Sequence, residues 1–394
     1  MTPLERRASA SLASIFALRM LGLFLVLPVF ALEARKYPGG DDPLLLGLAM
    51  GIYGLTQGLL QLPFGMASDR FGRKRVIVLG LLVFAAGSFW AAAATDLTQL
   101  LIGRSLQGAG AVSAAVTALL ADLTRDAVRT KAMAMVGASI GLMFALSLLL
   151  APALSAWVGL SGLFALTGAL ALLGVAVVIW GAPDAPAVPP GAPRARLREV
   201  LLDAGLMRMN LGVFVLHAVQ LAMWVAIPGL LVQAGLPKDA HWQVYLPAVL
   251  ASFVLLGGLF ALERRGYLKP VFLAAILLIA LVQLGLLVVA SGTPRLMPLA
   301  ALLFAFFCGF NLLEATQPSM VSRMAPQAVR GAAMGVFNTL QSLGFFVGGW
   351  AGGALVKSWG SQMLFVCCAA AMLLWWLLAL PMQAPARHPG PKAA

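Results

Sequence analysis

Long apolar runs separated by short cationic gaps constrain this chain more than any other feature. By the length rule of about 20 residues per membrane-crossing helix, such runs lie at roughly 11–33, 44–66, 76–95, 98–122, 132–157 and 160–181, and again at 205–234, 241–262, 270–291, 296–322, 331–356 and 361–381. Of the 394 residues, 61% are hydrophobic and 10% charged, whereas soluble domains are about 25% charged. The sequence predicts an all-α polytopic membrane protein with twelve transmembrane helices.

A segment rich in Pro and Ala separates the first six runs from the second six, and three arginines follow it. This composition neither spans a bilayer nor packs a core, so it indicates a linker. We therefore expect a six-helix bundle at 1–182, a cytoplasmic linker at 183–204, and a second six-helix bundle with a short tail at 205–394. Two matching sets of six also suggest an internal duplication.

The net charge of +13 raises the question of nucleic-acid binding, but the cations form no basic domain with interleaved aromatics. They follow membrane topology instead. Twenty of the 27 Lys and Arg residues fall at the termini and in one set of gaps, and five fall in the other set: Arg35, Lys36, Lys238, Arg295 and Lys357. By the positive-inside rule both termini face the cytoplasm. Arg6 and Arg7 precede the first run, and because no small-residue cleavage site follows, we expect an uncleaved helix.

Several functional classes lack their signatures. The three cysteines, Cys308, Cys367 and Cys368, lie inside apolar runs and show neither a disulfide framework nor zinc spacing. No GxxxxGK[ST] loop for a nucleotide is present, and the few polar residues inside the spans assemble no nucleophile, base and orienting group. We expect neither an enzyme nor a metal site nor a bound cofactor, with a proton gradient as the energy source.

The cationic gap between the second and third runs carries Gly65, Asp69-Arg70 and Gly72-Arg73-Lys74. This pattern resembles the signature loop of the major facilitator superfamily. Two further resemblances lie in the fourth span, at Leu100, Arg104, Gln107, Gly108 and Gly110, and in the fifth span, at Gly137, Gly141 and Ala151-Pro152, where the antiporter motif usually ends in Gly-Pro. The likeness covers the whole chain and points to the drug:proton antiporter branch. The run Arg19-Met20-Leu21-Gly22 with Pro28 is most similar to a bacterial inner-membrane type that has an additional soluble C-terminal domain, which we do not expect here.

The charges of the signature loop also have a physical reading of their own. Asp69 at a membrane surface is costly unless it meets Arg73 or the positive end of a helix, and Asp122 can complete a cluster with Arg73. The resemblance implies that this cluster latches the two halves in the outward-open state, with span 11 supplying a helix end near Gly331. The predicted latch comprises Gly65, Asp69, Arg70, Gly72, Arg73, Lys74 and Asp122. The alternative is that these charges only mark topology.

Four ionisable residues lie deep inside the predicted spans: Arg19, Arg104, His217 and Glu314. Such groups usually face a cavity or a partner, and the resemblance implies that spans 1, 7 and 10 line the central cavity. We expect Glu314, helped by His217, to load and release a proton, with Arg19 contributing to coupling and Arg104 to helix packing or coupling. The alternatives are a permanent ion pair with Arg19 or a hydrogen bond within span 10 for Glu314, packing for His217, and a snorkelling side chain for Arg104.

Polar amides within the spans are the candidates for orienting cargo: Gln57, Gln61, Gln107, Gln220, Asn311 and Gln317. They are sparse among apolar and aromatic residues, which favours greasy cargo over sugars. The sequence therefore predicts a secondary transporter that alternates access and exports hydrophobic or amphipathic small molecules against protons. The alternatives are a sugar or metabolite exporter, a lipid flippase, or a membrane scaffold without transport. The expected partners are the bilayer, protons and a small molecule, and the resemblance implies a monomer in the bacterial inner membrane.

Overall fold

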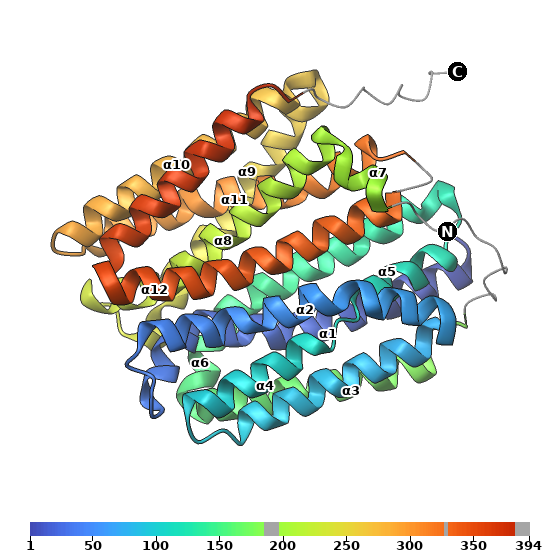
Figure 1. The fold of residues 1–394 in the computed structure, drawn as a ribbon, viewed down its shortest axis with the longest axis horizontal. Coiled ribbons are helices and arrows are strands. Elements are labelled where there is room, and N and C mark those ends of the chain that lie inside the picture. The colour runs from blue at the N-terminus through green and yellow to red at the C-terminus, as the bar shows by residue number, and fades with distance from the viewer. Residues whose placement is uncertain (185–196, 327–329, 383–394) are drawn as a thin grey trace.

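The computed structural model describes residues 1–184, 197–326 and 330–382 (Figure 1). These ranges contain helices and no strand, which confirms the all-α fold class. Residues 185–196 of the predicted linker and 383–394 of the tail lie outside them. In chain order the elements are α1 (Pro3–Glu33), η1 (Ala34–Lys36), α2 (Pro43–Phe71), α3 (Arg73–Ala92), α4 (Leu97–Ala109), α5 (Ser113–Asp122), α6 (Asp126–Ala176), η2 (Val177–Gly181), α7 (Leu197–Leu202), α8 (Ala204–Gln233), η3 (Lys238–Ala240), α9 (Trp242–Leu262), η4 (Glu263–Tyr267), α10 (Leu268–Ser291), α11 (Leu296–Met324) and α12 (Arg330–Ala379).

Aspartate side chains fix the starts of three helices. Asp42, Asp96 and Asp203 accept hydrogen bonds from backbone amides in the first turns of α2, α4 and α8, over 2.8–2.9 Å. These amides have no partner inside the helix, so a side-chain oxygen stabilises the start. At the first helix, Thr2 and Glu5 form a reciprocal capping box. Short polar sequences therefore set where α1, α2, α4 and α8 begin.

Two of the helices are long enough to cross a membrane twice. Both α6 and α12 contain a glycine outside the helical region, Gly159 with φ 64° and Gly360 with φ 80°. A positive φ is easily adopted by glycine alone, so the chain turns there and each helix supplies two spans. The fourth predicted span is instead broken into α4 and α5 at Gly110, where a Cβ atom would overlap the backbone of α3. The break lets the two helices pack against α3 without clearance.

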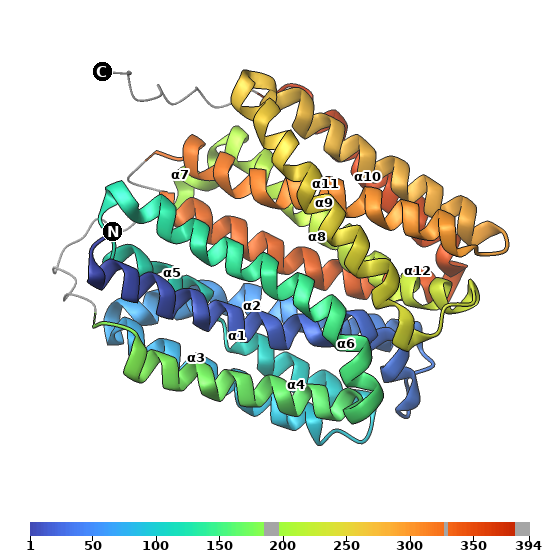
Figure 2. The ribbon, with the colours of Figure 1, turned by 180° about the vertical axis from the view of Figure 1, so that it is seen from behind.

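Nine helices in the described ranges have the length and hydropathy of membrane spans. Because α6 and α12 each turn back on themselves and supply two spans, these nine helices account for eleven of the predicted crossings. The broken fourth span, α4 with α5, falls short of the length criterion and supplies the twelfth. The spans form two bundles of six, α1–α6 and α8–α12, which lie side by side with α2 next to α12 (Figures 1 and 2). The domain boundaries at 182 and 204 stay a prediction.

The molecule has two chemically different ends (Figure 1). The basic end carries the N-terminus, α7 and the Asp69–Arg73 turn. The opposite end carries the turns at Gly159 and Gly360 and the start of α2.

The tightest contact between the halves is formed by glycines of α2 and α12. A Cβ atom at Gly47 or Gly349 would overlap the backbone of the other helix, and one at Gly51 would lie 2.8 Å from the carbonyl oxygen of Phe346. Further along α12, toward the basic end, Gly331 and Gly335 have no atom within 4 Å of such a Cβ. The halves therefore touch closely along the opposite end and part toward the basic end.

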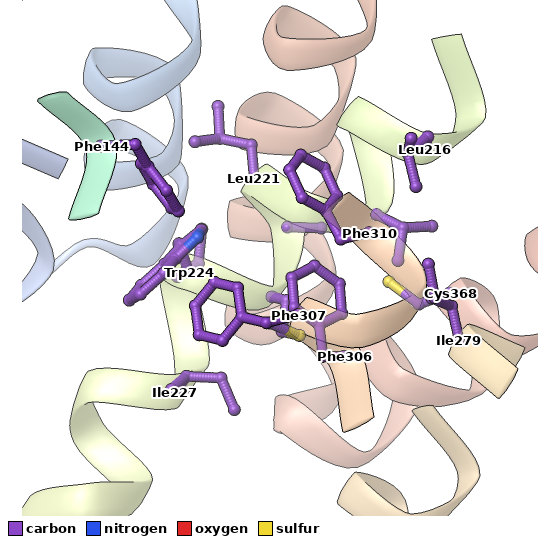
Figure 3. Close-up of a cluster of buried hydrophobic side chains, with 14 of the residues drawn as sticks. Phe144, Leu216, Leu221, Trp224, Ile227, Ile279, Phe306, Phe307, Phe310 and Cys368 are labelled. Carbon is purple, nitrogen blue, oxygen red and sulfur yellow. The ribbon is translucent and has the colours of Figure 1, made fainter. Parts of the chain in front are cut away.

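A cluster of buried aromatic side chains extends from one half into the other (Figure 3). Phe306, Phe307 and Phe310 of α11 are 0–6% exposed, and Phe307 meets Phe144 of α6 with ring centroids 6.1 Å apart. Phe144 in turn meets Phe24 of α1 at 5.1 Å. This edge-to-face chain adds directional contacts to an apolar seam.

Candidate functional site

Arg73 organises the turn between α2 and α3 at the basic end. Its Nε donates to Asp122 Oδ2 over 2.9 Å, its Nη1 donates to Ser68 Oγ over 2.8 Å, and it forms an ion pair with Asp69. The side chain is 12% exposed, although it carries a full charge. Three oxygens from α2 and α5 thus surround one guanidinium, whose fork of donors suits several acceptors at once.

The other residues of the predicted latch lie around this cluster. Gly72 ends α2 with φ 97°, so the turn itself requires glycine. A Cβ at Gly65 would make ordinary contact, 3.6 Å from Ala114, so this position does not demand glycine for close packing. Arg70 lies over the Phe71 ring, 5.3 Å from its centroid. Lys74 pairs with Asp184 over 2.8 Å and thereby lowers the pKa of that carboxyl group.

The predicted contact between this cluster and the start of α12 is not formed in the structure. Within the described ranges the partner of Asp69 is Arg73, and Asp69 is 59% exposed. A Cβ at Gly331 would have no neighbour within 4 Å. Because the halves part at the basic end, the cluster here ties α2, α3 and α5 of one half together. Its latch role stays a prediction for another conformation.

Arg19 belongs to a polar network buried inside the first half. It is 1% exposed, donates to Ser113 Oγ over 2.9 Å and to Tyr53 OH over 2.6 Å, and lies over the Phe84 ring. The contacts of Glu314 are with His217 and Gln341 instead, so the alternative of a permanent Arg19–Glu314 ion pair does not describe this conformation. Hydroxyl and ring partners replace a carboxylate around this buried charge.

Arg104 forms the second part of the same network. It is 5% exposed and donates to the carbonyl oxygens of Ala49 and Met50, each over 3.3 Å, and to Gln107 Oε1 over 2.9 Å. Gln107 passes the network on to Ser88 Oγ over 2.8 Å. These bonds hold α4 against α2 and α3. The geometry is that of helix packing, and the side chain does not snorkel.

In the second half, Glu314 and His217 contact each other. Glu314 Oε2 lies 3.1 Å from His217 Nε2, and a third residue, Gln341 of α12, bridges them: its Nε2 is 3.1 Å from Glu314 Oε1 and 2.8 Å from His217 Nε2. His217 is 1% exposed, between the rings of Phe310 and Phe345. The Glu314 side chain is 39% exposed, although its Oε2 is covered. Three helices, α8, α11 and α12, thus meet at one carboxyl group.

Hydrogen-bond chemistry limits how protons can be distributed in this triad, Glu314–His217–Gln341. His217 Nδ1 lies 2.8 Å from the Val213 carbonyl oxygen, so Nδ1 carries a proton as the donor. Nε2 is then the nitrogen that faces the carboxyl group. With no proton on either Nε2 or Oε2, two lone pairs would oppose each other at 3.1 Å. A proton between Glu314 and His217 removes this repulsion, and the single lone pair of Nε2 is then no longer free to accept from the Gln341 amide.

The predicted cargo amides are scattered, and they differ in their partners. Asn311 donates to Ser252 Oγ over 2.8 Å. The amide groups of Gln61 and Gln317 are buried and have no hydrogen-bond partner in the described part of the chain, and the same holds for the carbonyl of Gln220. Asn311 and Gln317 flank Glu314 by one helical turn, while Gln107 belongs to the Arg104 network. Gln57 is half-buried on α2.

Two cavities lie in the second half, and none of the predicted site residues lines either one. One of about 380 Å³ at the basic end is lined by Gly205, Arg208, Met209, Met320, Met324, Pro381 and Met382. The other, of about 460 Å³, is an apolar groove between α10 and α11, lined by residues that include Tyr267, Cys308 and Gly309. The Glu314 site therefore does not depend on either cavity.

Ion pairs join the two halves at the opposite end, and sequence reasoning missed them. Lys238 of the second half pairs with Glu33 of the first, which also accepts a 2.7 Å bond from Lys36. Lys357 pairs with Asp42 over 2.7 Å. The available signal was that few cations lie on this side of the chain and that acidic residues lie beside the first loop. Gln341 was missed as a site residue because nothing in its local sequence distinguishes it from a packing residue of span 11.

Comparison with known proteins agrees with this architecture. The sequence matches the Major Facilitator Superfamily over residues 12–349 and 261–394. It is 40% identical to the inner membrane transport protein YajR of Escherichia coli, over 98% of this chain and 85% of that protein. It is 26% identical to the quinolone resistance protein NorA of Staphylococcus aureus, over 85% of this chain and 86% of the relative.

The fold also matches solved structures at low identity. A D-xylose-proton symporter superposes with a TM-score of 0.76 at 15% identity, covering 96% of this chain and 98% of the other. At that identity the likeness concerns the fold. Together with the extended sequence match, it leads to one conclusion: this chain belongs to the Major Facilitator Superfamily, a family of membrane transporters and not of enzymes.

Proposed function

We propose that this transporter exports hydrophobic or amphipathic small molecules across a bacterial inner membrane in exchange for protons. The YajR relative is named as an inner membrane transport protein, and the more distant NorA relative as a quinolone resistance protein. The excess of cations at the basic end supports a cytoplasmic location for that end and for both termini. The energy source in this proposal is the proton gradient.

The proposed mechanism is alternating access. The halves touch through α2 and α12 and through two ion pairs at the opposite end, whereas a Cβ at Gly331 or Gly335 of α12, toward the basic end, would have no neighbour within 4 Å. With the basic end in the cytoplasm, this conformation faces inward. In the outward-facing conformation the contacts at the opposite end would break, and the Arg73 cluster would approach α12.

The observation that carries the proton proposal is the pair of Glu314 and His217. An acidic group among membrane-spanning helices is expensive to bury and is usually functional. Here its Oε2 lies 3.1 Å from Nε2 of the His217 imidazole, and part of the side chain is exposed. A carboxyl group with such a proton partner can exchange a proton during transport.

The proposed cargo class rests on the surroundings of this pair. Phe310 and Phe345 lie against His217, and the stacked pair Phe306–Phe310 continues the apolar wall, with centroids 5.5 Å apart. Apolar and aromatic walls with few polar groups suit greasy ligands. The carboxylate would favour cargo with a positive charge, because a cation and a proton can then compete for it.

The test is Glu314→Gln in proteoliposomes that carry an inward or outward proton gradient. For the natural sequence we expect gradient-driven movement of an amphipathic cationic dye and proton release when the dye binds. In Glu314→Gln both should fall to background, because the carboxyl group that exchanges the proton and attracts the cationic dye is absent. Asp41→Asn, the same change on an exposed loop, is the matched control.

Two outcomes would contradict the proposal. Proton-coupled dye movement that persists unchanged in Glu314→Gln would remove the proton site. If a panel of amphipathic cations, anions and neutral compounds shows no gradient-driven movement with the natural sequence, the proposal of proton-coupled export of such cargo is contradicted.

A further inference from the structure

Gln341 of α12 touches the proton pair and lies on the segment that meets the other half of the molecule. On one side its amide reaches Glu314 Oε1 and His217 Nε2, at 3.1 and 2.8 Å. One turn further along the helix, Phe345 packs edge-on against the same imidazole, with centroids 4.8 Å apart. The segment from 341 to 346 therefore contacts the Glu314–His217 pair through one polar and one aromatic side chain.

The same segment packs against α2 without clearance. A Cβ at Gly54 would overlap the Ser342 carbonyl oxygen and lie 3.0 Å from Cβ of Phe345, and one at Gly51 would lie 2.8 Å from the Phe346 carbonyl oxygen. These contacts are made by backbone atoms, which cannot rotate out of the way as a side chain can. A shift of α12 must therefore move α2 or open the seam.

On its other face, α12 is equally tight against α8. Cβ atoms at Gly344 and Gly348 would overlap the backbone at Phe214 and Ala218. His217 lies on that stretch of α8. α12 is thus packed tightly on both faces, against α8 beside the proton site and against α2 of the other half. Such packing allows the helix only a few discrete positions.

The side-chain amide of Gln341 can form hydrogen bonds with both Glu314 and His217 in one protonation state of this pair and not in the other. With neither Nε2 nor Oε2 protonated, the single lone pair of Nε2 can accept one N–H of the amide while the other N–H donates to Glu314 Oε1, over 2.8 and 3.1 Å. Once Nε2 carries a proton, an N–H would face an N–H at 2.8 Å. Rotating the amide by half a turn would instead set its carbonyl oxygen against the carboxylate. Either way, the best position of Gln341 changes with the proton.

We propose that Gln341 is the positioning residue that passes the proton occupancy of the Glu314–His217 pair to the α2–α12 seam and so to the opening of the opposite end. This inference rests on the proposed proton site. It assigns the coupling to one amide, whereas the proposed function requires only that the carboxyl group exchange a proton.

Among the described residues, no other titratable side chain is seen in contact with the pair. The helices packed around it carry their remaining charged groups toward their ends or in the buried network of the first half, and these are Glu5, Arg6, Arg7, Arg19 and Glu33 on α1, Asp69 and Arg70 on α2, Arg208 on α8, Lys269 on α10, Arg323 on α11, and Arg330 and Lys357 on α12. The pH response of the seam should therefore originate in the pair.

The experiment measures the distance between the two halves at the opposite end. Spin labels at Asp41→Cys and Trp359→Cys, one on each half and both exposed, report the distance across the seam in a full-length chain whose three native cysteines are replaced. Distances are recorded in lipid nanodiscs between pH 5 and 9. Gln341→Met keeps the size of the side chain and removes its hydrogen bonds. Gln362→Met makes the same change beyond the turn at Gly360 and is the matched control.

We expect the open-to-closed ratio of the unmodified background and of Gln362→Met to change with pH. Coupling free energies between sites correspond to roughly 5–150-fold changes in such ratios, so Gln341→Met should reduce the pH-driven change at least about fivefold. Gradient-free dye exchange should continue, which shows that the variant is folded. If Gln341→Met does not fold, Gln341→Asn, whose amide is one methylene shorter, takes its place with the same expectation.

The outcomes separate the two proposals. A full pH response in Gln341→Met, with Glu314→Gln unresponsive, overturns the role of Gln341 and leaves the proton site standing. A full response in Glu314→Gln contradicts the proton site itself. An equal loss in Gln362→Met would also overturn the inference, because the effect would then not depend on contact with the pair.

Discussion

Arg73 shows what one side chain contributes at a membrane surface. It contacts Asp69, Ser68 and Asp122 while only 12% exposed. A lysine could not present several donors in a fixed plane, so the signature arginine is explained by local geometry in this conformation. Sequence reasoning anticipated the pairing with Asp69 and Asp122, and it missed Ser68, whose hydroxyl also donates to the Gly65 carbonyl oxygen over 2.7 Å.

The turn beside Arg73 gives a prediction at the scale of one residue. Gly72 has φ 97°, and no atom lies within 4 Å of a Cβ placed there, so a side chain would be strained without clashing. Such backbone positions cost about 1–3 kcal/mol for other residues. Gly72→Ala should therefore lower the thermal midpoint of the protein in detergent. Gly137→Ala, which also has open space around it but no positive φ, should leave the midpoint unchanged or raise it. Equal midpoints for both variants would contradict this explanation.

The buried arginines of the first half illustrate the opposite case. Arg19 and Arg104 lie within spans, and we expected them to act with Glu314. The structure places them with Tyr53, Ser113 and Gln107 instead. Their spacing along the chain shows depth in the membrane, but depth does not decide which neighbouring helix a side chain meets.

At the scale of elements, α12 is the helix on which the halves depend. Glycines on two of its faces pack against α2 and α8, and close approach of this kind is how small residues associate helices in lipid. The sequence shows that residues 331–353 are rich in glycine. It could not assign each glycine to a neighbour, because that requires the rotation of the helix about its axis.

The seam between α2 and α12 can be tested with one methyl group. A Cβ at Gly349 would overlap Gly47 and lie 2.8 Å from the Gly51 amide nitrogen. Overpacking of this kind costs about 1–3 kcal/mol, and the cost falls only on the conformation that forms the seam. Gly349→Ala should therefore reduce disulfide cross-linking between Asp41→Cys and Trp359→Cys about fivefold or more. Gly331→Ala, which meets no neighbour, is the control and should cross-link normally. Unreduced cross-linking in Gly349→Ala would show that the seam can relax.

At the scale of the whole molecule, the opposite end is closed by charge pairs between the halves. Lys357 donates to Asp42 over 2.7 Å, and this bond is the main reason that the pKa of Asp42 lies below its usual value of 3.8. A lowered carboxyl pKa means that the pair stabilises the closed end above the usual pKa. The contribution is lost only as the pH falls through the lowered pKa. Between pH 5 and 8 the Asp42–Lys357 pair is therefore constant.

This leads to a prediction about pH. Asp42→Asn keeps the cap of α2, because Asn caps as well as Asp, and removes a partly exposed ion pair worth roughly 0.2–1 kcal/mol. The variant should open the opposite end slightly and equally at pH 5 and pH 8, measured by thiol labelling at Trp359→Cys. Any pH dependence of labelling should remain as in the natural sequence. A pH dependence that disappears in Asp42→Asn would place the proton sensor at this pair instead of at Glu314.

Most of the overall fold could be predicted because its signals are local. Each span needs a run of apolar residues of sufficient length, and each gap shows its charge directly. The correction came at the fourth span, which breaks at Gly110: the backbone leaves helical geometry there, with φ −76° and ψ 52°, where the chain lies directly against α3. At the candidate site, Glu314 and His217 were predicted to act together, and the structure places them in contact.

By itself, the sequence determined that this protein is a membrane transporter with its spans, its signature turn and its few deep charges, because lipid imposes length and charge rules on every segment separately. Only the tertiary structure decided that Gln341 bridges Glu314 and His217, that Arg19 turns to Tyr53, and that Glu33 and Asp42 reach cations of the other half. Those contacts join residues as many as 315 positions apart. They depend on the rotation and approach of whole helices, which no local pattern of residues specifies.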